Sequence, residues 1–135
     1  MNSKYPLLYS SLMAAVIFGI FHFVADSFYF YWTYWWSDMV MHFLAGVVGG
    51  LATYSVLFES GLWRRNSQTA LMRVIIVLFC VMTVGVAWEW LEYINGMTYA
   101  PEGYLIDTLS DLVLDGLGAL IASLICARSN ARVNG

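Results

Sequence analysis

The chain of 135 residues has the length of one domain, and 61% of its residues are hydrophobic while only 11% are charged, against roughly 45–50% and 25% in soluble domains. This composition excludes an ordinary soluble protein and predicts an integral membrane protein, with residues 1–135 forming a single membrane domain. The net charge is −3, and the six basic residues are spread over three places in the chain, so no nucleic-acid partner is expected.

Four apolar stretches are long enough to cross a bilayer as helices. They cover approximately residues 7–25, 38–58, 70–94 and 105–127. The first ends with His22 and Asp26. The aromatic segment 27–37 follows, and because Trp and Tyr gather at the headgroup level, we expect an interfacial loop or a short surface helix there. The second stretch opens with Asp38 and His42, which are spaced as neighbours on a helix.

Acidic residues also mark the adjoining ends of the third and fourth stretches. The third ends in the sequence WEWLEY, which places Glu89 and Glu92 close together on one helix. The fourth carries Asp107, Asp111 and Asp115, each four residues after the last. Four residues are about 6 Å of helical rise and about 40° of rotation, so these three carboxylates are predicted to form a stripe. An aspartate inside a membrane helix normally faces other helices or a wet cavity.

The positions of the basic residues predict the orientation of the chain. All of them flank the N-terminus, the second loop or the C-terminus, whereas the first and third loops have none. They are Lys4, Arg64, Arg65, Arg73, Arg128 and Arg132. The positive-inside rule then places both termini in the cytoplasm. We therefore expect an all-α, polytopic four-helix transmembrane bundle.

This topology puts the polar ends of all four helices on the outer side of the membrane, where histidine and carboxylate side chains gather. Such a set suits a divalent metal ion, namely Zn²⁺, Mn²⁺, Fe²⁺ or Mg²⁺. The candidate metal ligands are His42, Asp38, Glu89, Asp107, Asp111 and, in addition, His22. The candidate acid–base or proton-relay groups are Asp111, Asp115 and Glu89.

Three functions are compatible with this arrangement. A metal held there would activate a water or polarise a phosphoryl oxygen, which points to a lipid headgroup or a lipid-linked intermediate of the envelope as the partner. Alternatively, the acids and histidines relay protons or cations across the membrane, in which case a homo-oligomer is expected because four short helices leave little room for a pore. In the third interpretation the polar network only holds the helices together, and Asp38 and Asp107 cap helix N-termini.

The motifs resemble those of small bacterial inner-membrane proteins of the YjdF-like and VanZ-like groups. The resemblance rests on Asp38-x3-His42-Phe43, on Trp88-Glu89-x2-Glu92 and on Asp107-Thr108-x2-Asp111-x3-Asp115-x2-Gly118-Ala119. It implies a polytopic helical fold in a bacterial inner membrane, without an assigned activity, although VanZ-like proteins are associated with resistance to glycopeptide antibiotics. Asp115 departs from the VanZ-like pattern, where Asn is common, and no matching Arg precedes Asp107. The residues it singles out for testing are Asp38, His42, Glu89, Asp107, Asp111 and Asp115.

Overall fold

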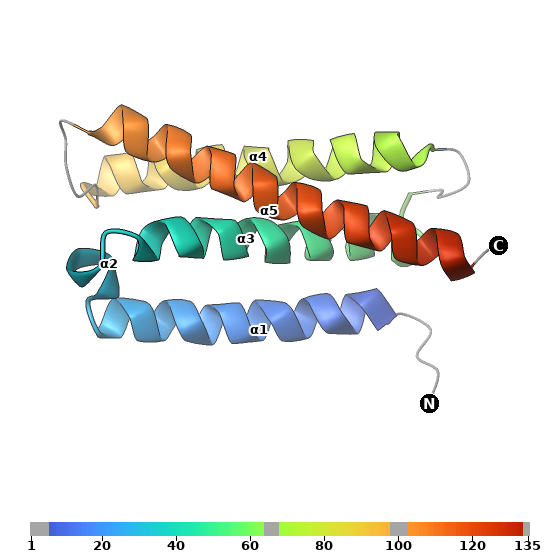
Figure 1. The fold of residues 1–135 in the computed structure, drawn as a ribbon, viewed down its shortest axis with the longest axis horizontal. Coiled ribbons are helices and arrows are strands. Elements are labelled where there is room, and N and C mark those ends of the chain that lie inside the picture. Colours follow the sequence, from blue (N-terminus) through green and yellow to red (C-terminus); the bar gives the residue numbers. More distant parts are fainter. Residues whose placement is uncertain (1–5, 64–67, 98–102, 134–135) are drawn as a thin grey trace.

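The chain folds into four long helices that lie alongside one another (Figure 1). The computed structural model describes residues 6–63, 68–97 and 103–133, with only the backbone described from 129 onward. The elements in chain order are α1 (Pro6–Ser27), α2 (Phe30–Thr33), α3 (Ser37–Tyr54), a π-helical turn η1 (Ser55–Glu59), α4 (Ala70–Asn95) and α5 (Tyr104–Val133). These ranges contain no strand, so the predicted all-α class is confirmed.

All four long helices have the length and composition of membrane spans. The candidate spans are Pro6–Ser27, Ser37–Glu59, Ala70–Asn95 and Tyr104–Arg128. Large apolar side chains such as Phe23 and Phe79 point away from the bundle and are more than two-thirds exposed. Helices can expose such side chains to lipid because their own hydrogen bonds satisfy the backbone polar groups. The four-helix membrane bundle is therefore confirmed as the fold of this chain.

Helices α3 and α5 approach each other closely through glycines. A Cβ atom added at Gly46 would overlap the backbone carbonyl of Asp115, and one added at Gly118 would overlap the carbonyl of Phe43. Small residues at such crossings let two backbones come into contact, as is common between membrane helices. This contact matters for the polar residues because it fixes Asp115 beside the first half of α3.

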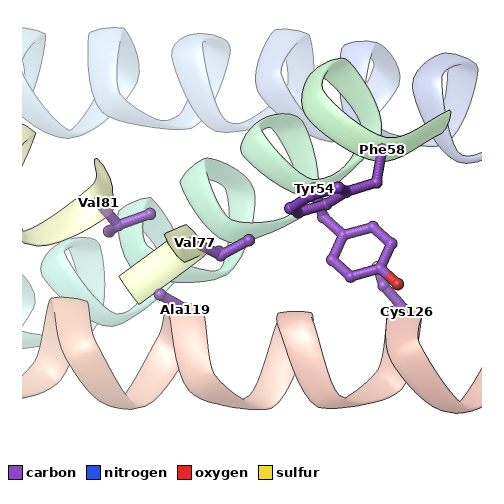
Figure 2. Close-up of a cluster of buried hydrophobic side chains, with 6 residues drawn as sticks. All are labelled: Tyr54, Phe58, Val77, Val81, Ala119 and Cys126. Carbon is purple, nitrogen blue, oxygen red and sulfur yellow. The ribbon is translucent and has the colours of Figure 1, made fainter. Parts of the chain in front are cut away.

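The apolar core fills the half of the bundle near the start of α1 and the end of α5. Tyr54 and Phe58 pack ring against ring, with centroids 5.2 Å apart, and Cys126 of α5 lies beside them (Figure 2). Arg73 donates a hydrogen bond from Nη1 to the Tyr54 hydroxyl at 3.3 Å. The buried cluster comprises Tyr54, Phe58, Val77, Val81, Ala119 and Cys126. The opposite half of the bundle carries most of the buried polar side chains.

The opposite end of the bundle, where α1 and α4 end and α3 and α5 begin, is called the polar end below. The aromatic segment forms the short helix α2 at this end (Figure 1). The N-cap of α3 is Trp36, so Asp38 lies in the first turn and the interpretation of Asp38 as a cap is wrong. Asp107 likewise lies inside the first turn of α5, which begins at Tyr104, so the interpretation of Asp107 as a cap is also wrong. Glu102 lies outside the described residues.

The basic residues that the structure describes lie away from the polar end. Arg73 is in the first turn of α4, and Arg128 is near the end of α5. Lys4, Arg64, Arg65 and the side chain of Arg132 lie outside the described residues.

Candidate metal centre

The polar end is built around His42, in the second turn of α3. Its side chain is buried, with 6% of the residue exposed, and it meets carboxylates from three helices. Nδ1 forms a hydrogen bond with Oδ2 of Asp115 at 3.4 Å. Nε2 lies 3.8 Å from Oε1 of Glu89 and 3.9 Å from Oδ1 of Asp38. The two ring nitrogens therefore face different surroundings, with one carboxylate on the Nδ1 side and two on the Nε2 side.

Asp115 reaches His42 because a glycine on α4 leaves it room. A Cβ atom at Gly85 would lie 2.7 Å from Oδ2 of Asp115 and 3.2 Å from Leu112. The backbone contact between Gly46 and Asp115 brings the same residue against α3. Asp115 is 4% exposed, so its carboxylate is almost fully buried inside the bundle. Glycines on two helices thus create the space that this aspartate occupies.

Glu89 lies on α4 with one carboxylate oxygen paired and the other not. Thr108 donates a hydrogen bond from Oγ1 to Oε2 of Glu89 at 2.8 Å, and the Tyr104 hydroxyl donates to the Glu89 backbone carbonyl at 3.1 Å. Oε1 of Glu89 is buried and has no hydrogen-bond partner among the described residues. This is the oxygen that faces Nε2 of His42. Buried polar atoms almost always have a partner, so an unpaired carboxylate oxygen at 4% exposure requires an explanation.

Asp111, one turn before Asp115 on α5, also carries an unpaired buried oxygen. It is 2% exposed, and its Oδ1 atom has no hydrogen-bond partner within the part of the chain that the structure describes. A buried carboxylate is costly unless it is paired, protonated or bound to a metal ion. Two such oxygens, one on α4 and one on α5, therefore lie unpaired near the same histidine.

Two groups of side chains in the described residues are close enough to share a metal ion. In each group one ligand atom per residue lies within 4.8 Å of the others. The groups are Asp38, His42 and Asp111, and His42, Glu89 and Glu92. Zinc lies about 2.0–2.2 Å from histidine nitrogen and carboxylate oxygen, so two of its ligands are at most about 4.2 Å apart. The 3.8 Å and 3.9 Å separations at Nε2 of His42 fall within that limit but are too long for hydrogen bonds. His42, Asp38 and Glu89 thus meet this distance limit for a shared divalent cation, and Asp111 and Glu92 complete the two groups.

The structure brings five of the seven predicted site residues together and leaves two apart. Asp38, His42, Glu89, Asp111 and Asp115 form the cluster around the imidazole. Asp107 is exposed and belongs to neither group. His22 also belongs to neither, and instead forms a hydrogen bond between Nδ1 and the Tyr31 hydroxyl at 2.7 Å.

Tyr31 of α2 lies close to the acids of three helices. Burial, followed by the negative charges of Asp38, Asp26 and Glu92, raises the pKa of its hydroxyl to about 12. The phenol therefore stays protonated and can keep its hydrogen bond to His22. The α1–α2 corner in this way adjoins the cluster through the uncharged Tyr31 phenol.

Two further residues associate with this cluster but were not among the predicted site residues. Glu92 joins the second group, and Trp88 donates a hydrogen bond from Nε1 to its Oε1 atom at 2.7 Å. Thr108 binds Glu89. Both left a signal in the sequence, because Glu92 is three residues after Glu89, and Thr108 precedes Asp111 by three residues and Asp115 by seven. A spacing of three and then seven follows a helix face more closely than repeated steps of four.

The comparisons with known proteins place the chain in a family. A search of the curated proteins and a search of the solved structures each found no match. The chain belongs to the family described as "Predicted membrane protein (DUF2238)", because the model of that family matches residues 1–132.

Proposed function

We propose that this protein binds a divalent metal ion at the polar end, with Nε2 of His42 and carboxylate oxygens of Asp38, Glu89 and Asp111 as ligands. The observation that carries the proposal is the pair of buried carboxylate oxygens on Glu89 and Asp111 that no described residue pairs with. They lie beside Nε2 of His42, whose nearest carboxylate oxygen among the described residues is 3.8 Å away. Carboxylates crowded into a buried site repel one another. A divalent cation removes that repulsion and satisfies the unpaired oxygens at once.

The ligand types narrow the choice of metal. One imidazole with several carboxylates suits Zn²⁺, Mn²⁺ or Fe²⁺, whereas Mg²⁺ prefers oxygen ligands and retains its waters. A metal ion bound there would supply Lewis acidity for a phosphoryl oxygen or would activate a water. The chain's own contribution is to hold the ligands and to exclude bulk water from His42, which is 6% exposed.

We further propose that the site faces the outer leaflet of a bacterial inner membrane, with both termini in the cytoplasm, and recognises or acts on the headgroup of an envelope lipid or a lipid-linked intermediate. Two features support this placement. The cluster begins at Asp38 in the first turn of α3, near the depth where a span meets the headgroups, and extends inward along α5 to Asp115. The aromatic rings around α2, including Trp32 and Trp35, are strongly exposed at the same end, as is typical of the membrane interface.

A comparison of two aspartates on the same helix tests the metal site. Asp111 belongs to a candidate ligand group, whereas Asp107, one turn away, is exposed and belongs to none. We expect the purified wild type and Asp107→Asn to carry nearly one metal ion per chain after loading with Zn²⁺ or Mn²⁺. Asp111→Asn should lose most of it while retaining its helical content. Equal metal content in the two variants would contradict the proposal.

Proton or cation transport is the alternative if metal is absent from every sample. The buried acids would then be protonated and hydrogen-bonded, and the reconstituted protein should carry protons or cations through a route that Asp115→Asn blocks. An unchanged flux in that variant, or no flux at all, would leave the polar network with a purely structural role. The resemblance to YjdF-like and VanZ-like proteins is compatible with each of these outcomes.

A further inference from the structure

Helix α5 contacts both of the central candidate ligands on the side that faces away from the proposed metal. On His42, the atom engaged by α5 is Nδ1, which binds Oδ2 of Asp115. On Glu89, the atom engaged is Oε2, which accepts a hydrogen bond from Thr108. The remaining atoms, Nε2 of His42 and Oε1 of Glu89, face each other at 3.8 Å. The same helix thus leaves one free ligand atom on each of two neighbouring helices.

The contact with Asp115 determines which nitrogen of His42 is available. A neutral imidazole carries its proton on one nitrogen only, and a carboxylate acceptor at Nδ1 favours that proton being there. Nε2 is then deprotonated and directed toward Asp38 and Glu89, as a metal ligand must be. Carboxylate groups that accept the second N–H of a ligating histidine fix both its protonated nitrogen and its ring orientation.

The contact with Thr108 has the equivalent effect on Glu89. A carboxylate can rotate about its last torsion angle and present either oxygen, and this torsion is only weakly restrained on its own. The 2.8 Å hydrogen bond from Thr108 holds Oε2 toward α5, so Oε1 is held toward α3. The second contact from α5, between the Tyr104 hydroxyl and the Glu89 carbonyl, restrains the backbone of the same residue.

From these contacts we infer that Asp115 and Thr108 are positioning residues, which arrange His42 and Glu89 for a metal ion without binding it themselves. This inference rests on the proposed metal site and assigns to α5 a second role beyond the ligand Asp111. It predicts a site that is formed before the metal arrives. Loss of either contact should weaken metal binding and change the metal's ligand field, although every ligand is still present.

Thr108 offers the cleaner test because a second threonine on the bundle can serve as a matched control. Thr108→Val removes the hydroxyl and keeps the shape, Thr108→Ser restores the hydroxyl, and Thr83→Val is the control. Thr83 is an exposed threonine whose hydroxyl donates to the Phe79 carbonyl of its own helix. We would titrate each purified protein with Co²⁺ and record both the dissociation constant and the visible absorption spectrum.

We expect Thr108→Val to bind Co²⁺ about 10–100-fold more weakly than the wild type, which is the usual effect of removing a partner of a metal ligand. Thr108→Ser should recover most of the affinity and the wild-type spectrum, and Thr83→Val should match the wild type. Asp115→Asn, which preserves size, should also weaken binding and shift the spectrum. A thermal melt without metal would show whether each variant is folded.

The outcomes separate this inference from the proposed function. If the wild type binds no Co²⁺, the proposed metal site is overturned and the inference with it. If the wild type binds Co²⁺ and the folded Thr108→Val and Asp115→Asn variants bind it equally well with the same spectrum, the metal site stands and the positioning role is overturned. A loss in Thr108→Val that Thr108→Ser does not restore would also overturn it.

Discussion

Oε1 of Glu89 lies 3.8 Å from Nε2 of His42, and no hydrogen bond from any described residue satisfies that oxygen. The two atoms come from different helices, and the remaining polar atoms of both side chains are held by α5. The separation is too long for a direct hydrogen bond and short enough for two ligands of one cation. This relationship is the basis of the metal-binding proposal.

The first prediction concerns the space that Gly85 leaves for Asp115. Gly85→Ala would place a Cβ atom 2.7 Å from Oδ2 of Asp115, so this carboxylate must leave the position in which it contacts His42. We expect overpacking of about 1–3 kcal/mol, visible as a lower melting temperature in detergent, together with weaker metal binding. Gly19→Ala is the matched control because no atom lies within 4 Å of the added Cβ. If both variants have the same melting temperature and the same metal affinity, a Cβ atom at position 85 does not displace Asp115.

The second prediction concerns Glu59 and the start of α1. The Glu59 carboxylate accepts hydrogen bonds from the backbone N–H of Leu7 at 3.1 Å and of Leu8 at 2.7 Å. These donors have no partner within their own helix, so removing the acceptor should cost about 0.5–2 kcal/mol, as for other helix caps. We expect Glu59→Ala to accelerate hydrogen exchange at both amides, and Glu59→Gln to do so less.

The same prediction includes an internal control. Metal content should be unchanged in Glu59→Ala, because Glu59 lies on η1, at the opposite end of the bundle from His42. Unchanged exchange at Leu7 and Leu8 would show that the carboxylate does not stabilise the start of α1 in solution.

The third prediction tests the orientation. Asn95 at the polar end and Leu62 at the other end are both exposed, so a cysteine at either position should be accessible to reagents on its own side. With both termini in the cytoplasm, an impermeant thiol reagent added to intact cells should label Asn95→Cys and not Leu62→Cys. The parent protein supplies the background from Cys80 and Cys126. Labelling of Leu62→Cys alone would reverse the topology and place the site on the cytoplasmic side.

The sequence was sufficient for the fold because each span is identified by its own apolar residues. Four long runs separated by turn residues leave little choice but four helices. The π-helical turn η1 was not predicted, because the run from 38 to 58 carries no marker for a change of hydrogen-bond pattern. The N-cap predicted at Asp38 lies two residues after the observed N-cap, Trp36. An error of this size is normal where helix ends are inferred from side-chain preference alone.

The site could be predicted only in part because residues spaced four apart do not stay on one face of a helix. Each step of four residues rotates about 40°, so Asp107 lies about 80° around α5 from Asp115, and the structure leaves it exposed. Thr108 faces the cluster instead, since spacings of three and seven stay on one face. The His42–Asp115 contact joins positions 73 residues apart. It depends on which helices pack together, and a single sequence does not specify that.

X-ray absorption spectroscopy of the Zn²⁺-loaded protein, compared with His42→Ala, is the measurement that tests the metal site most directly. We expect one imidazole nitrogen and two or three carboxylate oxygens at about 2.0–2.2 Å from the metal, with the imidazole signal lost in the variant. A shell that contains only oxygen, or an imidazole signal that persists in His42→Ala, would contradict a metal centre built on His42.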